Sequence, residues 1–214
     1  MRPIQVLYIH DFNGSAYEET YKNIEESLKK YPKIILHTIS WDLKDSSISV
    51  ERLNIINYIN ENKIDILIGN SVGGYIISSI NKPKILMNSP LDKMQLGIVG
   101  LYPDFYESYN KELWENYGPN NTEDIWICSS SKDNLFGTKS YSLVKNLFTN
   151  SNIIRNIFED EHVLKFENIE KVIDGMFNMI KSNDKLLNRL ENITEEDVHK
   201  YMKNVQNDSI IDIY

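Results

Sequence analysis

The sequence predicts a three-layer α/β fold with a doubly wound, mostly parallel sheet. Short apolar runs rich in β-branched residues alternate with stretches of helical periodicity, and glycine or proline separates many of them. Strands that alternate with helices form a parallel sheet with helices on both faces. If the first and third strands are neighbours, as in the order 2-1-3-4-5, their following loops flank the ligand-binding point of such sheets.

The first strand is predicted over residues 4–9 and delivers His10 to Gly14 into a loop. Ser15 then begins a helix, because Ser15 and Glu18 have the spacing of a capping box. Pro32 ends this helix. The apolar face of the helix is expected to contain Tyr17, Tyr21, Ile24 and Leu28.

The next four elements follow the same alternation. Residues 34–39 form the second strand, and Val50, Leu53 and Ile56 mark the apolar face of the second helix. A third strand over 64–68 leads into a buried helix over 75–80. The fourth strand, 83–90, is stopped by its final proline.

Strands five and six are predicted at 125–128 and 153–158, with a helix around 143–148 between them. The segment 91–121 interrupts the alternation. It is rich in aromatic residues interleaved with acids, which predicts a loop with a short helix over the sheet edge. Its aromatic part, from Tyr102 to Tyr117, either borders a substrate pocket or packs as an ordinary helix face.

The C-terminal part is predicted to be helical. Ile169 to Ile180 has the periodicity of a long amphipathic helix, and Thr194 with Asp197 marks a further helix start. We expect one domain over 1–182, with 183–214 as a helical extension packed on the same domain. This extension supplies either an extra packed helix or the contact surface of a homo-oligomer.

Composition excludes several classes of function. The 214 residues are 41% hydrophobic and 25% charged, as in globular domains. A net charge of -8 without a basic cluster argues against nucleic-acid binding. Cys128 is the only cysteine, which predicts a reducing compartment, the cytoplasm. The N-terminal apolar run is too short for a signal peptide, and no apolar segment is long enough to span a membrane.

The sequence from Gly69 to Gly73 has the Gly-x-Ser-x-Gly pattern of a nucleophile elbow centred on Ser71. A serine on so tight a strand-to-helix turn faces outward, and the glycines let strand and helix backbones approach. The pattern predicts Ser71 as a nucleophile. The alternative is a glycine-rich turn with a helix-capping serine.

A serine nucleophile needs a base, and the base needs an orienting acid. Of the four histidines, only His162 follows the last strand, which suits the chain order serine, acid, histidine. Asp133 directly follows strand five and is the first choice for the acid. The alternatives are a surface histidine at a helix start and an aspartate that stabilises a turn.

Asp160 and Glu161 are rival acids, but residues so near His162 in sequence seldom point at its ring. Asp160, Glu161 and His162 also suggest a metal site. We expect no metal there, because no second histidine stands at ligand spacing. The main-chain N–H groups of Val72 and Phe12 are the predicted oxyanion hole.

The chain resembles the YqiA-like esterases, which are small α/β-hydrolases with little or no cap domain. The matching pieces cover most of the chain to about residue 170. They are Tyr8-Ile9-His10-x-Phe12-Asn13, the elbow with Gly74-Tyr75, Asn88-x-Pro90, Asp133 and Asp160-x-His162.

The resemblance implies an α/β-hydrolase fold and hydrolysis of carboxylic esters, with acyl thioesters as further substrates. It implies a triad of Ser71, Asp133 and His162 and no cofactor. We expect a small-molecule ester to contact His10, Asn13, Tyr75 and Tyr102.

Two features depart from that family. Asp11 stands where the family usually has glycine, and its charge would oppose a nearby oxyanion. A positive φ at Asp11 would cost about 1 kcal/mol. The portion beyond Ser182 is also longer than expected. A non-catalytic binding protein on a hydrolase scaffold therefore stays open. A flavodoxin-like phosphate binder that uses the loop 69–74 is a second alternative, but it has little support because no lysine or arginine follows that loop.

Overall fold

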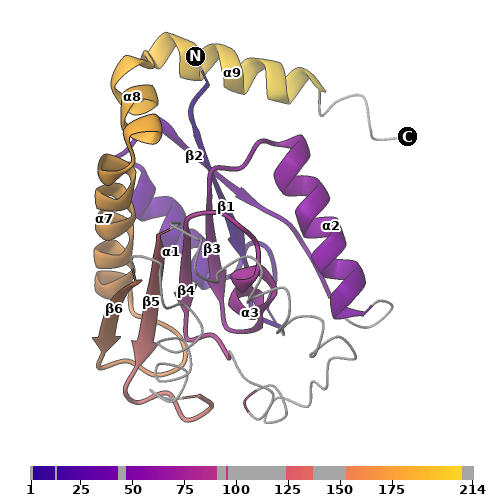
Figure 1. Cartoon of the computed structure of the whole chain (residues 1–214), viewed down its shortest axis with the longest axis vertical. Helices are drawn as coiled ribbons and strands as arrows, with labels where there is room; N and C mark the ends of the chain where they lie inside the picture. The colour runs from indigo at the N-terminus through magenta and orange to yellow at the C-terminus, as the bar shows by residue number, and fades with distance from the viewer. Residues whose placement is uncertain are drawn as a thin grey trace.

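The computed structural model describes residues 2–12, 14–42, 47–90, 95, 124–136 and 153–208. Six strands form one sheet in the order β2-β1-β3-β4-β5-β6, and all five neighbouring pairs are parallel. The predicted parallel α/β architecture and the predicted neighbourhood of strands one and three are therefore confirmed. Figure 1 shows the twisted sheet between two layers of helices.

The strands agree with the predicted runs to within a few residues. They are β1 (Ile4–Ile9), β2 (Ile34–Thr38), β3 (Ile66–Asn70), β4 (Lys84–Met87), β5 (Ile125–Ser130) and β6 (Ile153–Phe158). The described helices are α1 (Glu19–Leu28), α2 (Ile48–Glu61), α3 (Val72–Ser78), α7 (Phe166–Ser182), α8 (Asp184–Asn192) and α9 (Glu195–Asp208).

Both faces of the four central strands, β1, β3, β4 and β5, are buried, whereas the edge strands β2 and β6 are partly exposed. Along β1, Val6 and Tyr8 belong to the core under α1 and α7. Leu7 and Ile9 belong to the core under α2 and α3. Successive side chains of a strand point to opposite faces, so one apolar run serves both layers.

Helix α1 begins four residues later than predicted. The N-cap is Glu18, and its side chain makes no capping hydrogen bond. The Glu18 carboxylate instead accepts a hydrogen bond from the Tyr8 hydroxyl of β1. This contact draws Glu18 toward the sheet and leaves 15–18 as a turn. Tyr17 consequently lies outside the helix and is 67% exposed, so its predicted place on the apolar face was wrong.

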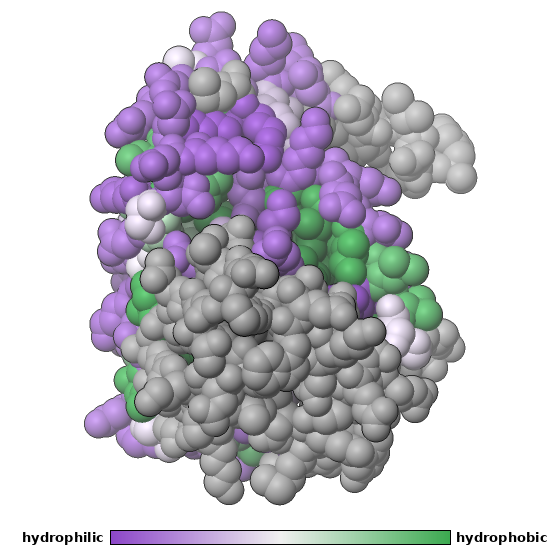
Figure 2. All heavy atoms as spheres, viewed as in Figure 1, coloured by the Kyte–Doolittle hydropathy of each residue, from purple (hydrophilic) through white to green (hydrophobic). Residues whose placement is uncertain are grey.

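Helix α2 exists as predicted, but its buried face was assigned wrongly. Ile48, Ile55 and Ile59 are buried, whereas Val50 and Leu53 are 49% and 57% exposed. The spacings of seven and four residues between the buried isoleucines define one helix face. Figure 2 shows exposed apolar atoms over α2.

Helix α8 was not predicted as a separate element. The Asn183 side chain accepts a hydrogen bond from the Leu186 amide at 3.1 Å and caps its start. Leu186 and Leu190 lie in the core under α1 and α7, and Arg189 forms an ion pair with Asp65. Helix α8 therefore packs on the same core and sheet. Thr194 and Asp197 cap α9 reciprocally, as their spacing predicts.

None of the helices in the described ranges is long and apolar enough to cross a membrane. The predicted helix at 143–148 and nearly all of the aromatic segment 91–121 lie outside the described residues.

Candidate active site

Ser71 occupies the sharp turn between β3 and α3. Its φ of 50° and ψ of -124° lie outside the helical and extended regions, as a strained elbow demands. Its main-chain N–H donates to the carbonyl oxygen of Met87 on the neighbouring strand at 2.8 Å. The turn is thus held by the sheet, and the serine stands at the carboxyl ends of the strands.

The elbow glycines are required by close backbone approaches. A Cβ on Gly69 would come within 2.6 Å of the Gly74 nitrogen, so strand and helix nearly touch there. A Cβ on Gly73 would come within 2.5 Å of the carbonyl oxygen of Ile9. The start of α3 therefore packs directly on the end of β1, which brings the following loop close to Ser71.

Asp133 and His162, from the loops after β5 and β6, are in contact. The distance from His162 Nδ1 to Asp133 Oδ2 is 3.1 Å. The other carboxylate oxygen, Oδ1, accepts the amide of Leu135 at 2.8 Å and that of Phe136 at 3.3 Å. The Asp133 side chain has no exposed area, whereas that of His162 is 17% exposed.

The hydrogen bonds keep Asp133 ionised. Burial alone would raise the pKa of its carboxyl, but the hydrogen bond from His162 and those from the Leu135 and Phe136 amides outweigh burial and lower the pKa. An ionised carboxylate accepts only, so His162 Nδ1 carries the proton. With the proton on Nδ1, the Nε2 atom is the nitrogen that can accept a proton.

Asn88, directly after β4, links the pair to the elbow. Its amide Nδ2 donates to the carbonyl oxygen of His162 at 2.6 Å and to Ser130 Oγ at 2.9 Å. Its Oδ1 accepts the Ser130 amide at 2.7 Å. The sequence contained Asn88 within a family motif, but its spacing gave no indication of this positioning role.

Ser71, Asp133 and His162 all lie at the carboxyl edge of the sheet. The structure brings Asp133 and His162 together, and it places Ser71 on the turn that is bonded to Met87, next to Asn88. The contacts of the described residues include no hydrogen bond between Ser71 Oγ and the His162 ring.

His10, a predicted substrate contact, packs against Trp41. It is buried, stacks on Trp41 at 5.4 Å, and its Nε2 accepts the Trp41 amide at 3.4 Å. Its Nδ1 donates to the carbonyl oxygen of Asp11 at 2.6 Å. Burial lowers the pKa of His10, so the neutral ring with the proton on Nδ1 satisfies both partners.

Tyr75 is also a predicted substrate contact. Its side chain is fully buried in the core under α2 and α3. The helical register after Ser71 turns Tyr75 inward. Asn13 and Tyr102, the other predicted substrate contacts, lie outside the described residues.

The two predicted oxyanion donors are main-chain groups next to this edge. Val72 is the first residue of α3, so its N–H has no partner within the helix. The Asp11 carbonyl oxygen accepts from His10 Nδ1 and from the Gly14 amide at 3.3 Å. Because a trans peptide points its N–H opposite to its C=O, these bonds also set the direction of the Phe12 N–H.

The rival acid Asp160 has a different task. Its Oδ2 accepts the amide of Lys165, the N-cap residue of α7, at 3.1 Å and Asn168 Nδ2 of the first turn at 2.7 Å, so it ties the preceding loop to the start of α7. No group of three His, Cys, Asp or Glu side chains within the described ranges is arranged to hold a metal ion.

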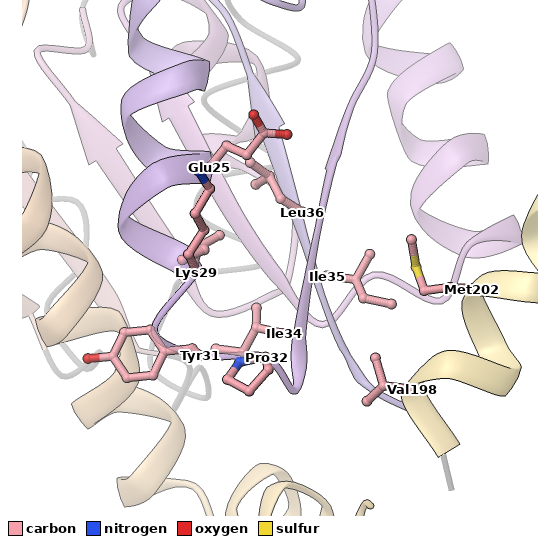
Figure 3. A pocket seen from close by; sticks show the side chains of 10 residues that line it. Glu25, Lys29, Tyr31, Pro32, Ile34, Ile35, Leu36, Val198 and Met202 are labelled. Carbon is pink, nitrogen blue, oxygen red and sulfur yellow. The ribbon is translucent and has the colours of Figure 1, made fainter. Parts of the chain in front are cut away.

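Two pockets differ in their relation to this edge. One of about 370 Å³ is lined by Lys132, Asn134, Glu161, His162 and Val163, so it opens beside the His162 ring. Another, of about 320 Å³, lies between α1, β2 and α9 and includes Ile35, Val198 and Met202 (Figure 3). The residues before β2 line the second pocket, which places it toward the amino ends of the strands, away from Ser71.

The architecture matches solved structures of the α/β-hydrolase fold. Est1E from Butyrivibrio proteoclasticus superposes with a TM-score of 0.63 at 15% identity, over 84% of this chain and 89% of that one. Alpha/beta hydrolase domain-containing protein 10 from mouse gives a TM-score of 0.63 at 12% identity, over 81% and 89%. A monoacylglycerol lipase of Paleococcus ferrophilus gives 0.62 at 11% identity, over 82% and 95%.

The chain therefore has an α/β-hydrolase fold. Its sequence matches no protein-family model, and it matches none of the curated proteins compared with it. At these identities the structural likeness establishes the fold, and any activity has to be argued from the site.

Proposed function

We propose that this chain is a serine hydrolase that cleaves carboxylic esters of small molecules. Ser71 is the nucleophile, His162 the general base and Asp133 the residue that orients and stabilises the imidazole. The observation that carries the proposal is the buried Asp133–His162 hydrogen bond of 3.1 Å, at the sheet edge where the elbow presents Ser71.

In the first half-reaction, Ser71 Oγ attacks the ester carbonyl carbon while His162 Nε2 takes its proton. A tetrahedral intermediate forms, and its oxyanion is stabilised by the N–H groups of Val72 and Phe12. The protonated His162 then gives its proton to the leaving alcohol, which departs and leaves an acyl group on Ser71. The ionised Asp133 stabilises the imidazolium during this step.

In the second half-reaction, water takes the place of the alcohol. His162 accepts a proton from the water, which attacks the acyl carbon through the same oxyanion arrangement. The carboxylic acid is released, and the proton returns to Ser71. No step requires a metal or an organic cofactor.

The structural neighbours are consistent with an ester substrate. They include Est1E with bound ferulic acid, an esterase domain from a Rhodothermus marinus protein and an esterase of Pyrococcus furiosus. We propose small carboxylic esters as the substrate class, with acyl thioesters and a YqiA-like relationship as the finer hypothesis. The pocket beside His162 is the proposed place of the leaving group.

The competing function is a binding protein that retains the scaffold without turnover. Hydrolysis of a short chromogenic ester separates the two functions. We expect turnover by the wild type and a loss of several powers of ten in kcat for Ser71→Ala. Equal rates for the two proteins would eliminate the proposed chemistry, and no turnover of esters or thioesters by the wild type would favour a binding protein.

A further inference from the structure

The loop that carries the proposed oxyanion donor Phe12 contains a pair of facing carboxyl groups that the chemistry above does not use. The pair consists of Asp11, directly before Phe12, and Glu18, directly before α1. Asp11 Oδ1 is buried, and it has no hydrogen-bond partner among the residues that the structure describes. A buried acceptor without a partner is costly, which calls for a donor that the heavy atoms alone do not reveal.

Glu18 is the neighbour that can supply this donor. A Cβ on Gly14 would clash with both Glu18 Oε2 and Asp11 Oδ1, so the two oxygens crowd one point beside a residue that has no side chain. The other oxygen of Glu18, Oε1, accepts a hydrogen bond from the buried Tyr8 hydroxyl. The Oε2 atom therefore stands toward Asp11.

The surroundings disfavour two negative charges. Burial raises the pKa of Glu18, and the charge of Asp11 adds to this effect, while hydrogen bonds from Tyr8 and the Ser15 amide act in the opposite direction. The titratable groups that face the pair are Tyr8 from β1 and the neutral His10. In the described part of the chain, neither carboxyl group forms an ion pair with a Lys, Arg or His side chain.

We propose that Glu18 is protonated and donates a hydrogen bond from Oε2 to Asp11 Oδ1, and that this bond makes Glu18 a positioning residue for the oxyanion loop. The chain of donors then runs from the Tyr8 hydroxyl to Glu18 and from Glu18 to Asp11. The bond from Glu18 gives Asp11 Oδ1 a hydrogen-bond donor and removes the repulsion between the two carboxyl groups.

The consequence concerns the Phe12 N–H. The main-chain oxygen of Asp11 is held by His10 Nδ1 and the Gly14 amide, and the Glu18 bond holds its side chain against the start of α1. When Glu18 loses its proton, two like charges face each other in a partly buried site. Asp11 then moves away from Glu18, and the Phe12 N–H is no longer held in a fixed orientation.

The proton itself can be tested without any assay of activity. Carboxyl carbon NMR of the full chain should give Glu18 a pKa above the ordinary glutamate value, and Asp11→Asn should move it back toward that value. An ordinary Glu18 pKa in the wild type would overturn the proposal. So would a Glu18 titration that shifts on addition of calcium chloride, because the pair would then hold a cation.

The effect on catalysis rests on the proposed function and is tested with Glu18→Gln, whose amide can donate to Asp11 at any pH. The ratio of kcat for Glu18→Gln to kcat for the wild type should rise about tenfold or more with pH, with its midpoint at the Glu18 pKa from NMR. Glu26→Gln, an exposed exchange on the same helix, should give a constant ratio.

Suppose that NMR finds a raised Glu18 pKa but the ratio of kcat for Glu18→Gln to kcat for the wild type does not change with pH. That result would overturn the positioning role of Glu18. If the wild type hydrolyses no ester, the proposed function fails, and the NMR titration still decides whether the proton is shared.

Discussion

The side-chain amide of Asn88 donates a 2.6 Å hydrogen bond to the carbonyl oxygen of His162. Asn88 has a φ of 45°, a left-handed conformation that asparagine tolerates better than most residues. The loop that carries the proposed general base is thus held from strand β4, and the main-chain bond from Ser71 to Met87 anchors the proposed nucleophile to the same strand. Asn88 therefore controls the relative placement of two groups that it does not contact through their side chains.

Replacement of Asn88 by Ala should separate the His162 loop from β4. We expect kcat to fall about 10- to 100-fold, because small displacements in a positioned site are costly. Stability should fall by about 1–3 kcal/mol, since the Ser130 amide loses its acceptor. Steady-state kinetics and urea unfolding measure the two effects.

The matched control for this exchange is Asn192→Ala on the exposed end of α8, where the side chain bonds only to Asn188. Asn192→Ala should change neither kcat nor the free energy of unfolding appreciably. An Asn88→Ala protein with the kinetics of the wild type would show that the Asn88 bond does not position His162.

Alanine substitutions at the adjacent glycines Gly73 and Gly74 should differ in whether a second substitution can restore stability. A Cβ at Gly73 meets the main chain of Ile9 and His10, which cannot rotate away, so Gly73→Ala should severely destabilise or unfold the protein. A Cβ at Gly74 would clash first with the Ser89 side chain and would then lie 3.0 Å from the Gly69 carbonyl oxygen. Ser89→Gly should therefore restore a Gly74→Ala protein in part. Thermal unfolding measures both. Equal losses at the two positions, or no rescue by Ser89→Gly, would contradict this account of the elbow.

Asp133 should contribute stability that depends on pH. Its pKa is lowered in the folded protein, so the contribution is present above the unfolded value of about 4 and is lost as the pH falls through the folded value. The free energy of unfolding of the wild type should exceed that of Asp133→Asn at pH 5, and the difference should shrink below pH 4. Denaturant titrations from pH 7 to pH 3 measure it. A difference that stays constant to pH 3 would mean that Asp133 is not held as a hydrogen-bonded anion.

Asp65 anchors the C-terminal extension to the sheet. Its carboxylate accepts from Arg2, from the Gln5 amide and from Arg189 of α8. Asp65→Ala should cost about 3–5 kcal/mol, because two partly buried guanidinium groups lose their anion. Hydrogen exchange should show faster opening of α8 in the variant. Glu26→Ala, which breaks an exposed pair with Lys29, should leave the stability nearly unchanged, because solvent screens exposed ion pairs.

The four central strands could be predicted from sequence because strands buried on both faces must be largely apolar, and the partly exposed edge strands β2 and β6 still contain short isoleucine-rich runs. All six runs predicted as strands are strands. The buried face of a helix was harder to predict, as α2 demonstrates. Val50 and Leu53 also have helical spacing, and only the packing reveals that Ile55 and Ile59 face the sheet. The start of α1 was missed because Glu18 bonds to Tyr8, a residue ten positions earlier on another element.

For the site, sequence order was sufficient to select the Asp133 and His162 that the structure brings into contact. It was not sufficient for His10, whose burial against Trp41 depends on where the chain returns after β2. Asp11 also does not need the positive φ that would have strained it. Among the non-glycine residues that the structure describes, only Lys63, Ser71 and Asn88 have positive φ, so Asp11 fits its loop without that cost.

Covalent trapping of Ser71 tests the central claim most directly. A fluorophosphonate should add one equivalent to the wild type, with the adduct on the peptide that contains Ser71, and the reaction should slow by orders of magnitude in His162→Ala. Ser71→Ala should take up no label. Labelling of Ser71→Ala at the rate of the wild type, or an adduct on another residue, would contradict a Ser71 nucleophile activated by His162.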